Sequence, residues 1–220
     1  MRADWLVSAA IAALLILAAC NSDGDGVSDG GTQAASPPTG RIAFTSQVDG
    51  KEEVYVINAD GSGLTNLTND PERDSEPSWS PDGSRLSFSS ERGGPGQDIY
   101  VMNLAAGDIL RLTDSRAVDG GVEWSPDGSR IVFYGFEDQS VGLLWITGAE
   151  GGDAVPLLDS IHPAGPDVAC AGGFPGGWFP DNHRIVFRGT HAASGAGQIC
   201  SVNADGTDIR VIYTEPDTLS

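Results

Sequence analysis

Short apolar runs, each bounded by Gly, Pro, Asp or Asn, recur along the chain from about residue 40 onward. Typical runs are Val54–Asn58, Ile99–Asn103 and Ile199–Asn203, which are rich in β-branched and aromatic residues. Two of them end in the turn signal Asn-Ala-Asp-Gly, and such spacing is typical of strands joined by tight turns. The pattern predicts an all-β protein, and the thirty glycines and thirteen prolines fit its many turns.

One segment of the chain is repeated. It reads Trp-Ser-Pro-Asp-Gly-Ser-Arg at Trp79–Arg85 and again at Trp124–Arg130, and each copy continues into an apolar strand. Trp178–Phe187 is a diverged third copy, and Ser36–Phe44 is a weaker copy without the Trp. The arginines of the four copies, at positions 41, 85, 130 and 184, are 44, 45 and 54 residues apart. A period of about 40–45 residues is typical of a four-stranded propeller blade.

The contents of each unit agree with four strands. Pro-Asp-Gly favours a tight turn, because Pro fixes φ and Gly accepts a positive φ. That turn joins a strand ending in Trp-Ser to a second strand beginning at the Arg. We expect the third strands at 54–58, 99–103, 144–147 and 199–203, and the fourth at 64–68, 110–113, 155–158 and 209–212.

The Trp-Ser-Pro-Asp-Gly repeat resembles that of the TolB-like, WD-repeat-like β-propellers, and it is also similar to the propeller domains of prolyl-oligopeptidase-type enzymes. The resemblance covers about residues 36–214 and implies that the strand ending in the Trp is innermost. TolB-like propellers usually have six blades, whereas this chain supplies about four, at 40–68, 77–113, 122–158 and 176–214.

The length of the chain leaves the closure of the ring open. Blade one begins at its second strand, because Gln33-Ala34-Ala35 is a poor strand. Three interpretations follow: a fragment of a longer six-bladed protein, self-association or assembly with another chain through the open edge, or an imperfect four-bladed closure.

The N-terminus reads as an export signal. Residues 5–19 are apolar except for Ser8, a run too short for the roughly 20 residues of a membrane span, and it ends in small residues. Leu17-Ala18-Ala19-Cys20 resembles the lipobox of bacterial lipoproteins, in which the Cys is lipidated. We expect a signal peptide at 1–19, a lipid anchor on Cys20, a flexible acidic linker at 20–39 and the propeller at 40–220. A plain N-terminal anchor with an incidental Cys is the alternative.

The resemblance to lipoproteins also predicts a location. Stable anchoring takes more than one acyl chain, which a diacylglycerol and an N-acyl group on Cys20 would supply. The chain would then lie in the cell envelope on the extracytoplasmic side. Asn21, rather than Asp, follows the Cys, which implies the outer membrane and periplasm in a source with two membranes.

The net charge of −19 excludes some classes of partner. Nucleic-acid binding needs Lys and Arg for phosphate contacts, so we expect none. Asp23, Asp25 and Asp29, with Gly26, match positions of a calcium loop, but position twelve is Thr32 rather than Glu. We therefore expect a solvated acidic tether and no cofactor, with Ca²⁺ as the alternative.

Two further groups of residues are candidates for a role. Cys170 and Cys200 remain after lipidation of Cys20, and in an exported chain they predict a disulfide, with two buried thiols as the alternative. Acidic residues precede two inner strands, where the resemblance implies one mouth of the channel and a negative potential for a cation or basic partner. They are Asp74, Glu76, Asp119 and Glu123.

Catalytic chemistry finds little support in the sequence. No Gly-x-Ser-x-Gly elbow occurs, so the peptidase resemblance implies a propeller without its catalytic domain. His162, His183 and His191 have no spacing typical of metal ligands. We expect a non-enzymatic, lipid-anchored binding module for an envelope protein or surface polymer. A metal-assisted polysaccharide lyase or hydrolase using these histidines is the alternative.

Overall fold

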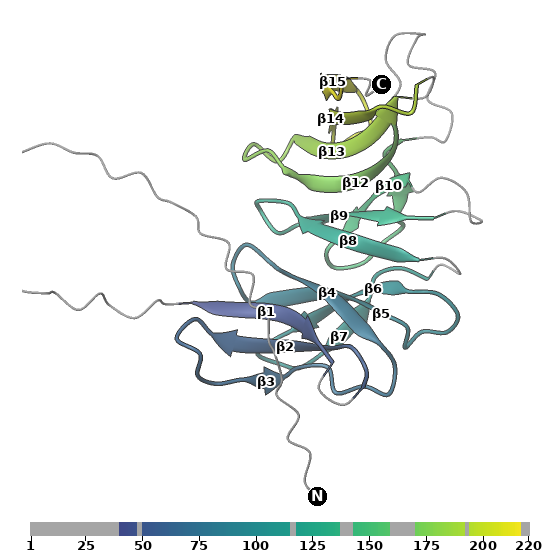
Figure 1. The fold of residues 1–220 in the computed structure, drawn as a ribbon. Coiled ribbons are helices and arrows are strands. Elements are labelled where there is room, and N and C mark those ends of the chain that lie inside the picture. Colours follow the sequence, from purple (N-terminus) through teal and green to yellow (C-terminus); the bar gives the residue numbers. More distant parts are fainter. Residues whose placement is uncertain are drawn as a thin grey trace, which may run out of the picture. The chain divides into compact units, whose positions relative to one another are not determined.

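The computed structural model describes residues 40–47, 50–114, 118–136, 143–158, 170–191 and 194–216. They belong to a compact unit that spans Pro37–Ser220. All regular elements in these ranges are β-strands (Figure 1), as the sequence pattern predicts. The described ranges hold no helix that is long and apolar enough to cross a membrane.

Blade one is a sheet of three strands. It consists of β1 (Arg41–Ser46), β2 (Glu53–Asn58) and β3 (Thr65–Asn66), in the order β1-β2-β3. All pairs are antiparallel, and Arg41 lies opposite Asn58. Among the described residues, the sheet therefore begins at the second strand of the repeat.

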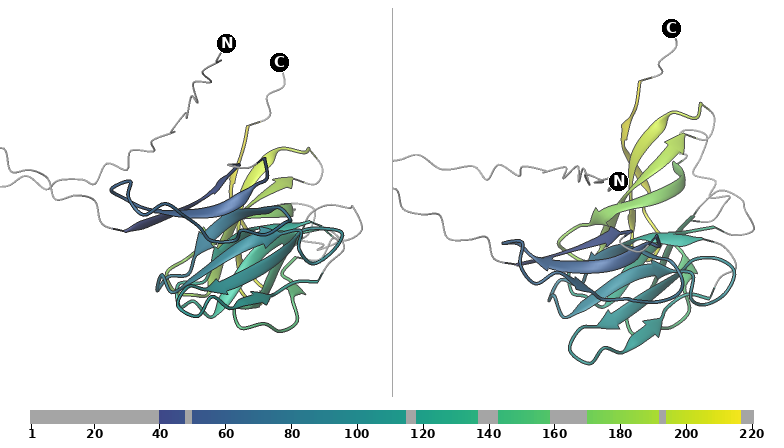
Figure 2. Two further views of the ribbon diagram at one scale, coloured as in Figure 1. Left: turned by 90° about the horizontal axis from the view of Figure 1, so that it is seen from below. Right: turned by 60° about the horizontal axis from the view of Figure 1, so that its bottom comes forward.

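The other three sheets have four antiparallel strands each, in chain order, and Figure 2 shows them from two further directions. Blade two is β4 (Asp74–Trp79), β5 (Arg85–Ser90), β6 (Asp98–Asn103) and β7 (Ile109–Arg111). Blade three is β8 (Asp119–Trp124), β9 (Arg130–Gly135), β10 (Leu143–Gly148) and β11 (Val155–Pro156). Blade four is β12 (Cys170–Trp178), β13 (Arg184–His191), β14 (Gly197–Asn203) and β15 (Arg210–Thr214). The all-β, four-bladed propeller fold is thereby confirmed.

Strand β12 starts earlier than the sequence indicates. The expected boundary of blade four is residue 176, whereas β12 begins at Cys170 and pairs with β13 from His191 back to Ile185. The register shifts twice, between Ala171 and Phe174 and between Pro175 and Gly177. A Pro and several Gly residues weaken a strand signal, but such residues are typical of bulges within a strand.

The core consists mainly of side chains from the second and third strands of neighbouring blades. In the three complete blades the last residue of the Arg-x-x-Phe segment is among the most buried, with Phe88 and Phe187 at 0 % and Phe133 at 2 % exposure, whereas Phe44 of blade one is only partly buried. Full burial of such a ring contributes about 1.5–3 kcal/mol. The repeat therefore places one aromatic anchor in each complete blade.

The Pro-Asp-Gly turns form a hydrogen-bonded motif. In blade two, Asp82 accepts hydrogen bonds from Ser80 Oγ at 2.6 Å and from Ser84 Oγ at 2.7 Å. Gly83 has a φ of +68° and Gly128 a φ of +70°, a region where a side chain is strained. In blade four Asn182 replaces the Gly at a φ of +61°, and Asn is one of the few residues that tolerate this conformation.

These turns predict an acid-sensitive contribution to stability. Hydrogen bonds from Ser80 and Ser84 lower the pKa of Asp82 to about 2, and bonds from Ser129 and Ser125 lower the pKa of Asp127 to about 2. Both pKa values lie below the ordinary 3.8. The two ionised carboxylates therefore stabilise the folded protein above about pH 4, and this contribution to the free energy of unfolding is lost as the pH falls toward 2. Urea unfolding at several pH values should show this loss, and a D82N/D127N variant should show a smaller change over the same window. An equal change in both proteins would contradict the assignment.

One repeated contact joins successive blades. The guanidinium of the repeat Arg stacks on the indole of the Trp in the next blade, with 4.8 Å to the ring centre in each case. The pairs are Arg41 on Trp79, Arg85 on Trp124 and Arg130 on Trp178. Each of these Arg residues also donates to a carbonyl oxygen in the turn of the next blade, that of Gly83, Gly128 or Asn182. The repeat thus supplies residues both to the strands within a blade and to the interface between neighbouring blades.

Candidate binding site

The four predicted channel-mouth acids lie on two inner strands rather than before them, because β4 and β8 begin three residues earlier than predicted. They do not share one environment. Asp74 on β4 is fully buried and accepts a hydrogen bond from Arg92 at 2.8 Å. Glu76, also on β4, is exposed and accepts a hydrogen bond from the backbone N–H of Gly121 in blade three at 2.9 Å. The structure thus brings Glu76 beside β8, whereas the carboxylate of Asp74 is engaged within its own blade.

The two acids on β8 differ in the same way. Asp119 is 3 % exposed and lies at the start of the strand. Glu123 is half-buried near its end, and this burial raises the pKa of its carboxyl group above the ordinary value. Only Glu76 is therefore exposed among the four, and the role predicted for them as a group stays a prediction.

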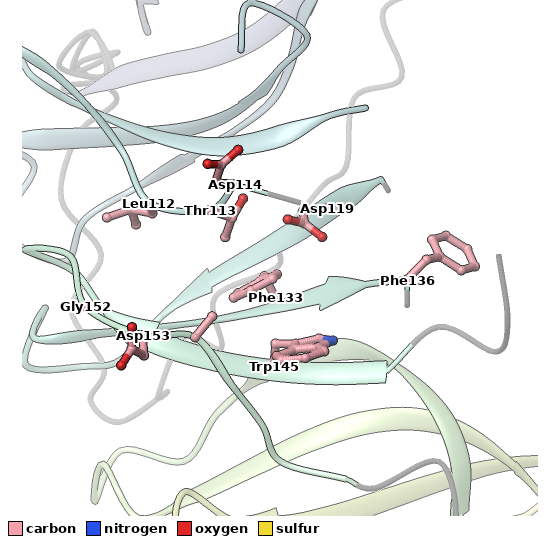
Figure 3. A pocket seen from close by; sticks show the side chains of 10 residues that line it. Leu112, Thr113, Asp114, Asp119, Phe133, Phe136, Trp145, Gly152 and Asp153 are labelled. Atoms are coloured by element: carbon pink, nitrogen blue, oxygen red, sulfur yellow. The ribbon is translucent and has the colours of Figure 1, made fainter. Parts of the chain in front are cut away.

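A cleft of about 400 Å³ lies between blades two and three. Its walls come from the segment after β7, from β8 and β9, from β10 and from the turn between β10 and β11 (Figure 3). Three aromatic and three acidic residues contribute side chains to the lining: Phe133, Phe136, Trp145, Asp114, Asp119 and Asp153. The cleft therefore combines apolar ring surfaces with carboxylates.

The aromatic part of the cleft is fixed by strand pairing. Trp145 on β10 lies directly opposite Phe133 on β9. Phe133 is buried, whereas Trp145 is only partly buried and presents its ring to the space. A Cβ at Gly135 would lie 2.7 Å from Asp119 Oδ1 and 3.3 Å from Trp145 Nε1. The glycine thus leaves room for a carboxylate and an indole beside the same strand.

The charge of the lining is negative. No Lys or Arg is among the described residues that line the cleft. Asp114 forms an ion pair with Arg111 at 2.7 Å, and the same guanidinium also contacts Asp98 at 2.7 Å. Asp153 lies exposed on the turn that forms the opposite wall. Carboxylates next to partly exposed aromatic rings suit a cation with an apolar stem, such as a Lys or Arg side chain.

Cys170 and Cys200 form a disulfide whose Cα atoms are 6.5 Å apart. Because Cys170 belongs to β12 and Cys200 to β14, the bond links the first and third strands of blade four across β13. The predicted start of blade four at residue 176 places Cys170 in a connection before the blade, whereas the structure places it within β12. Both sulfur-bearing residues belong to the apolar core cluster of blades three and four.

The described histidines do not meet. His183 lies in the turn before β13, and His191 is the last residue of that strand. At about 3.3 Å per residue the strand separates them by roughly 25 Å. His191 Nδ1 instead lies 2.9 Å from Ser194 Oγ. The third histidine, His162, lies outside the described residues, as do Cys20 and the acids Asp23, Asp25 and Asp29.

A family model for the TolB β-propeller domain matches residues 28–139, which is 112 of the 220 residues. The chain belongs to the TolB β-propeller domain family. The match begins upstream of β1 and ends just after β9, so it includes both complete Trp-Ser-Pro-Asp-Gly copies.

Solved structures agree with this family in fold. A protein assigned to TolB from Agrobacterium tumefaciens superimposes with a TM-score of 0.63 at 22 % identity, over 79 % of this chain and 61 % of that one. TolB from Acinetobacter baumannii gives 0.61 at 23 % identity, over 76 % and 38 %. An oligogalacturonate lyase in complex with manganese gives 0.52 at 19 % identity, over 74 % and 44 %. The chain thus spans less than two thirds of the length of each.

The sequence did not point to most of the cleft. Asp119 is the only one of its six side chains among the predicted site residues. Asp114 and Asp153 stand in loops with ordinary acidic composition, and Trp145 occupies a position where blades one and two have Tyr55 and Tyr100. That exchange of Tyr for Trp at one repeat position was the available signal.

Proposed function

We propose that this chain is a lipid-anchored β-propeller of the bacterial cell envelope that binds a basic segment of another envelope protein and catalyses no reaction. The observation that carries the proposal is the cleft between blades two and three, with its partly exposed Trp145 and its carboxylates. The net charge of −19 favours the same class of partner, because a negative field attracts cations from a distance.

Two further observations support the envelope location. The lipobox-like Leu17-Ala18-Ala19-Cys20 closes the N-terminal apolar run. The disulfide between Cys170 and Cys200 suits an oxidising compartment, because disulfides persist outside the cytoplasm. An anchored binding module presents its cleft to other molecules of the envelope.

The anchor leads to a direct prediction. The mature protein from a membrane fraction should begin at Cys20 and carry a diacylglycerol and an acyl group, as read by mass spectrometry of the N-terminal peptide. A Cys20→Ser variant, exported by a cleavable signal peptide without a lipobox, should leave the membrane fraction, since it has no thiol to carry the lipid. An N-terminal peptide with an unmodified Cys20 would refute the anchor.

The cleft is tested by capture of partners from envelope extracts. The bait is the mature chain, compared with D114N/D153N, which removes two carboxylates from the cleft, and with the matched variant E72Q/D108N, which removes two exposed carboxylates elsewhere. We expect a basic protein to be retained by the wild type and by E72Q/D108N but lost with D114N/D153N. A retained polysaccharide, or equal retention by all three baits, would contradict the proposed partner.

A further inference from the structure

The Trp indoles between blades follow a second hydrogen-bond rule. Trp124 Nε1 donates to the carbonyl oxygen of Ser78 at 3.2 Å, and Trp178 Nε1 donates to that of Glu123 at 3.3 Å. Both acceptors are the residue before the Trp on the inner strand of the preceding blade. The inner strand of each blade therefore supplies a backbone acceptor to the indole of the next.

Trp79 departs from this rule. Its Nε1 is buried and has no hydrogen-bond partner among the described residues, while its ring is covered by Arg41. Trp124 has a second acceptor in Ser87 Oγ at 3.0 Å, but the matching residue in blade one is Ala43, which has no hydroxyl group. A buried N–H donor without an acceptor is rare and costs stability. We therefore expect a carbonyl oxygen to bind the Trp79 indole N–H.

The missing acceptor coincides with the missing strand. Strand β1 is at the edge of its sheet and pairs with β2 alone among the described strands. In blades two to four the matching position beside the second strand is filled by β4, β8 or β12. A strand laid against β1 would continue that row of inner strands and would present carbonyl groups toward Trp79.

We infer that the edge of β1 that no described strand covers accepts an extended, basic segment of another polypeptide, whose backbone completes blade one and whose carbonyl oxygen accepts the Trp79 indole N–H. Main-chain pairing at a sheet edge is a common mode of peptide recognition. The edge of β1 is separate from the cleft. A failure of the proposed function would therefore leave this inference intact, and the reverse also holds.

The chain's own sequence favours an external strand. The residues that match an inner strand by position, 30–35, are Gly, Gly, Thr, Gln, Ala and Ala, with Ala35 where the other blades have Trp. They lack the large side chains that β8 supplies through Val122 and Trp124. Two observations favour Lys or Arg in the bound segment. The protein carries a net charge of −19. The exposed Glu76 also lies beside β1, because the backbone N–H of Glu76 donates to Thr45 Oγ1.

The test is an NMR titration of the mature chain with the capped peptide Lys-Val-Thr-Val-Thr-Val-Lys. Its control replaces both Thr residues by Pro, which keeps the charge but removes the donors needed for pairing. We expect the Trp79 indole N–H resonance to shift with saturation and to exchange more slowly with solvent, with the Pro peptide inactive. A Trp79→Phe variant should keep its thermal stability but bind the peptide roughly three- to ten-fold more weakly. A Trp124→Phe variant should lose stability instead, since its bonds exist in the free protein.

Three results would overturn the inference. The first is no saturable shift of the Trp79 resonance at millimolar peptide. The second is an indole already protected in the free chain that becomes exposed when residues 28–36 are deleted, because the chain's own segment would then occupy the edge. The third is concentration-dependent sedimentation that Trp79→Phe weakens, because the occupant would then be a second copy.

Discussion

Replacing Cys170 and Cys200 together by Ala is expected to lower the free energy of unfolding by about 3–4 kcal/mol. The bond closes a segment with a sequence separation of 30, and cross-linking a loop of this size removes that much entropy from the unfolded chain. Chemical denaturation of the oxidised protein and of the variant measures the difference.

Reduction provides the matched control for this prediction. Dithiothreitol should destabilise the wild type by a similar amount and leave C170A/C200A unchanged. The cleft lies between blades two and three, away from the disulfide, so its ligand affinity should be retained in the folded variant. Equal stability of the wild type with and without reductant would contradict a structural role for the bond.

The second large effect is expected at the interface of blades three and four. Trp178→Ala should cost about 2–3 kcal/mol, because truncating a large core aromatic typically costs 3–5 kcal/mol and Trp178 is partly buried. It removes the ring under Arg130, the indole bond to the Glu123 carbonyl and a packing partner of the core cluster. Thermal unfolding should show a lower midpoint and, if blade four separates first, a broader transition.

Two conservative variants separate the parts of this interface. Trp178→Phe keeps a ring beneath Arg130 and should lose only about 1 kcal/mol, the usual worth of a hydrogen bond. Arg130→Ala removes the stacked cation and its bond to the Asn182 carbonyl and should fall between the two. If all three variants lose the same stability, the predicted order is wrong, because the ring that Trp178→Phe retains would then contribute nothing.

The sequence predicted the repeat of the fold because its signals are local. Pro81-Asp82-Gly83 specifies a turn without help from the rest of the chain, and the Phe of Arg-x-x-Phe is placed inward by strand alternation. The predicted start of strand β12 was wrong because the bulges of this strand interrupt that alternation. Only the pairing of β12 with β13 defines where the strand begins.

The Trp series at positions 79, 124 and 178 predicts packing between blades, but its arginine partners could not be predicted in the same way. Arg85 and Trp79 are six positions apart in one repeat, which suggests contact within a blade, yet Arg85 stacks on Trp124 of the next blade. The cleft depends on the relative placement of two blades, which no residue pattern encodes locally. The predicted acids were grouped by their chain positions, whereas burial and the ion pair with Arg92 set Asp74 apart.

The most direct test of the account is an NMR titration of the isotope-labelled mature chain with tetralysine at low and high salt. We expect the Trp145 indole resonance and those of Asp114 and Asp153 to shift with saturation, with weaker binding at high salt, because salt screens ionic attraction. The D114N/D153N variant should lose the response and E72Q/D108N should keep it. Shifts spread over all acidic turns, or an undiminished response of Trp145 in D114N/D153N, would contradict the cleft as the binding site.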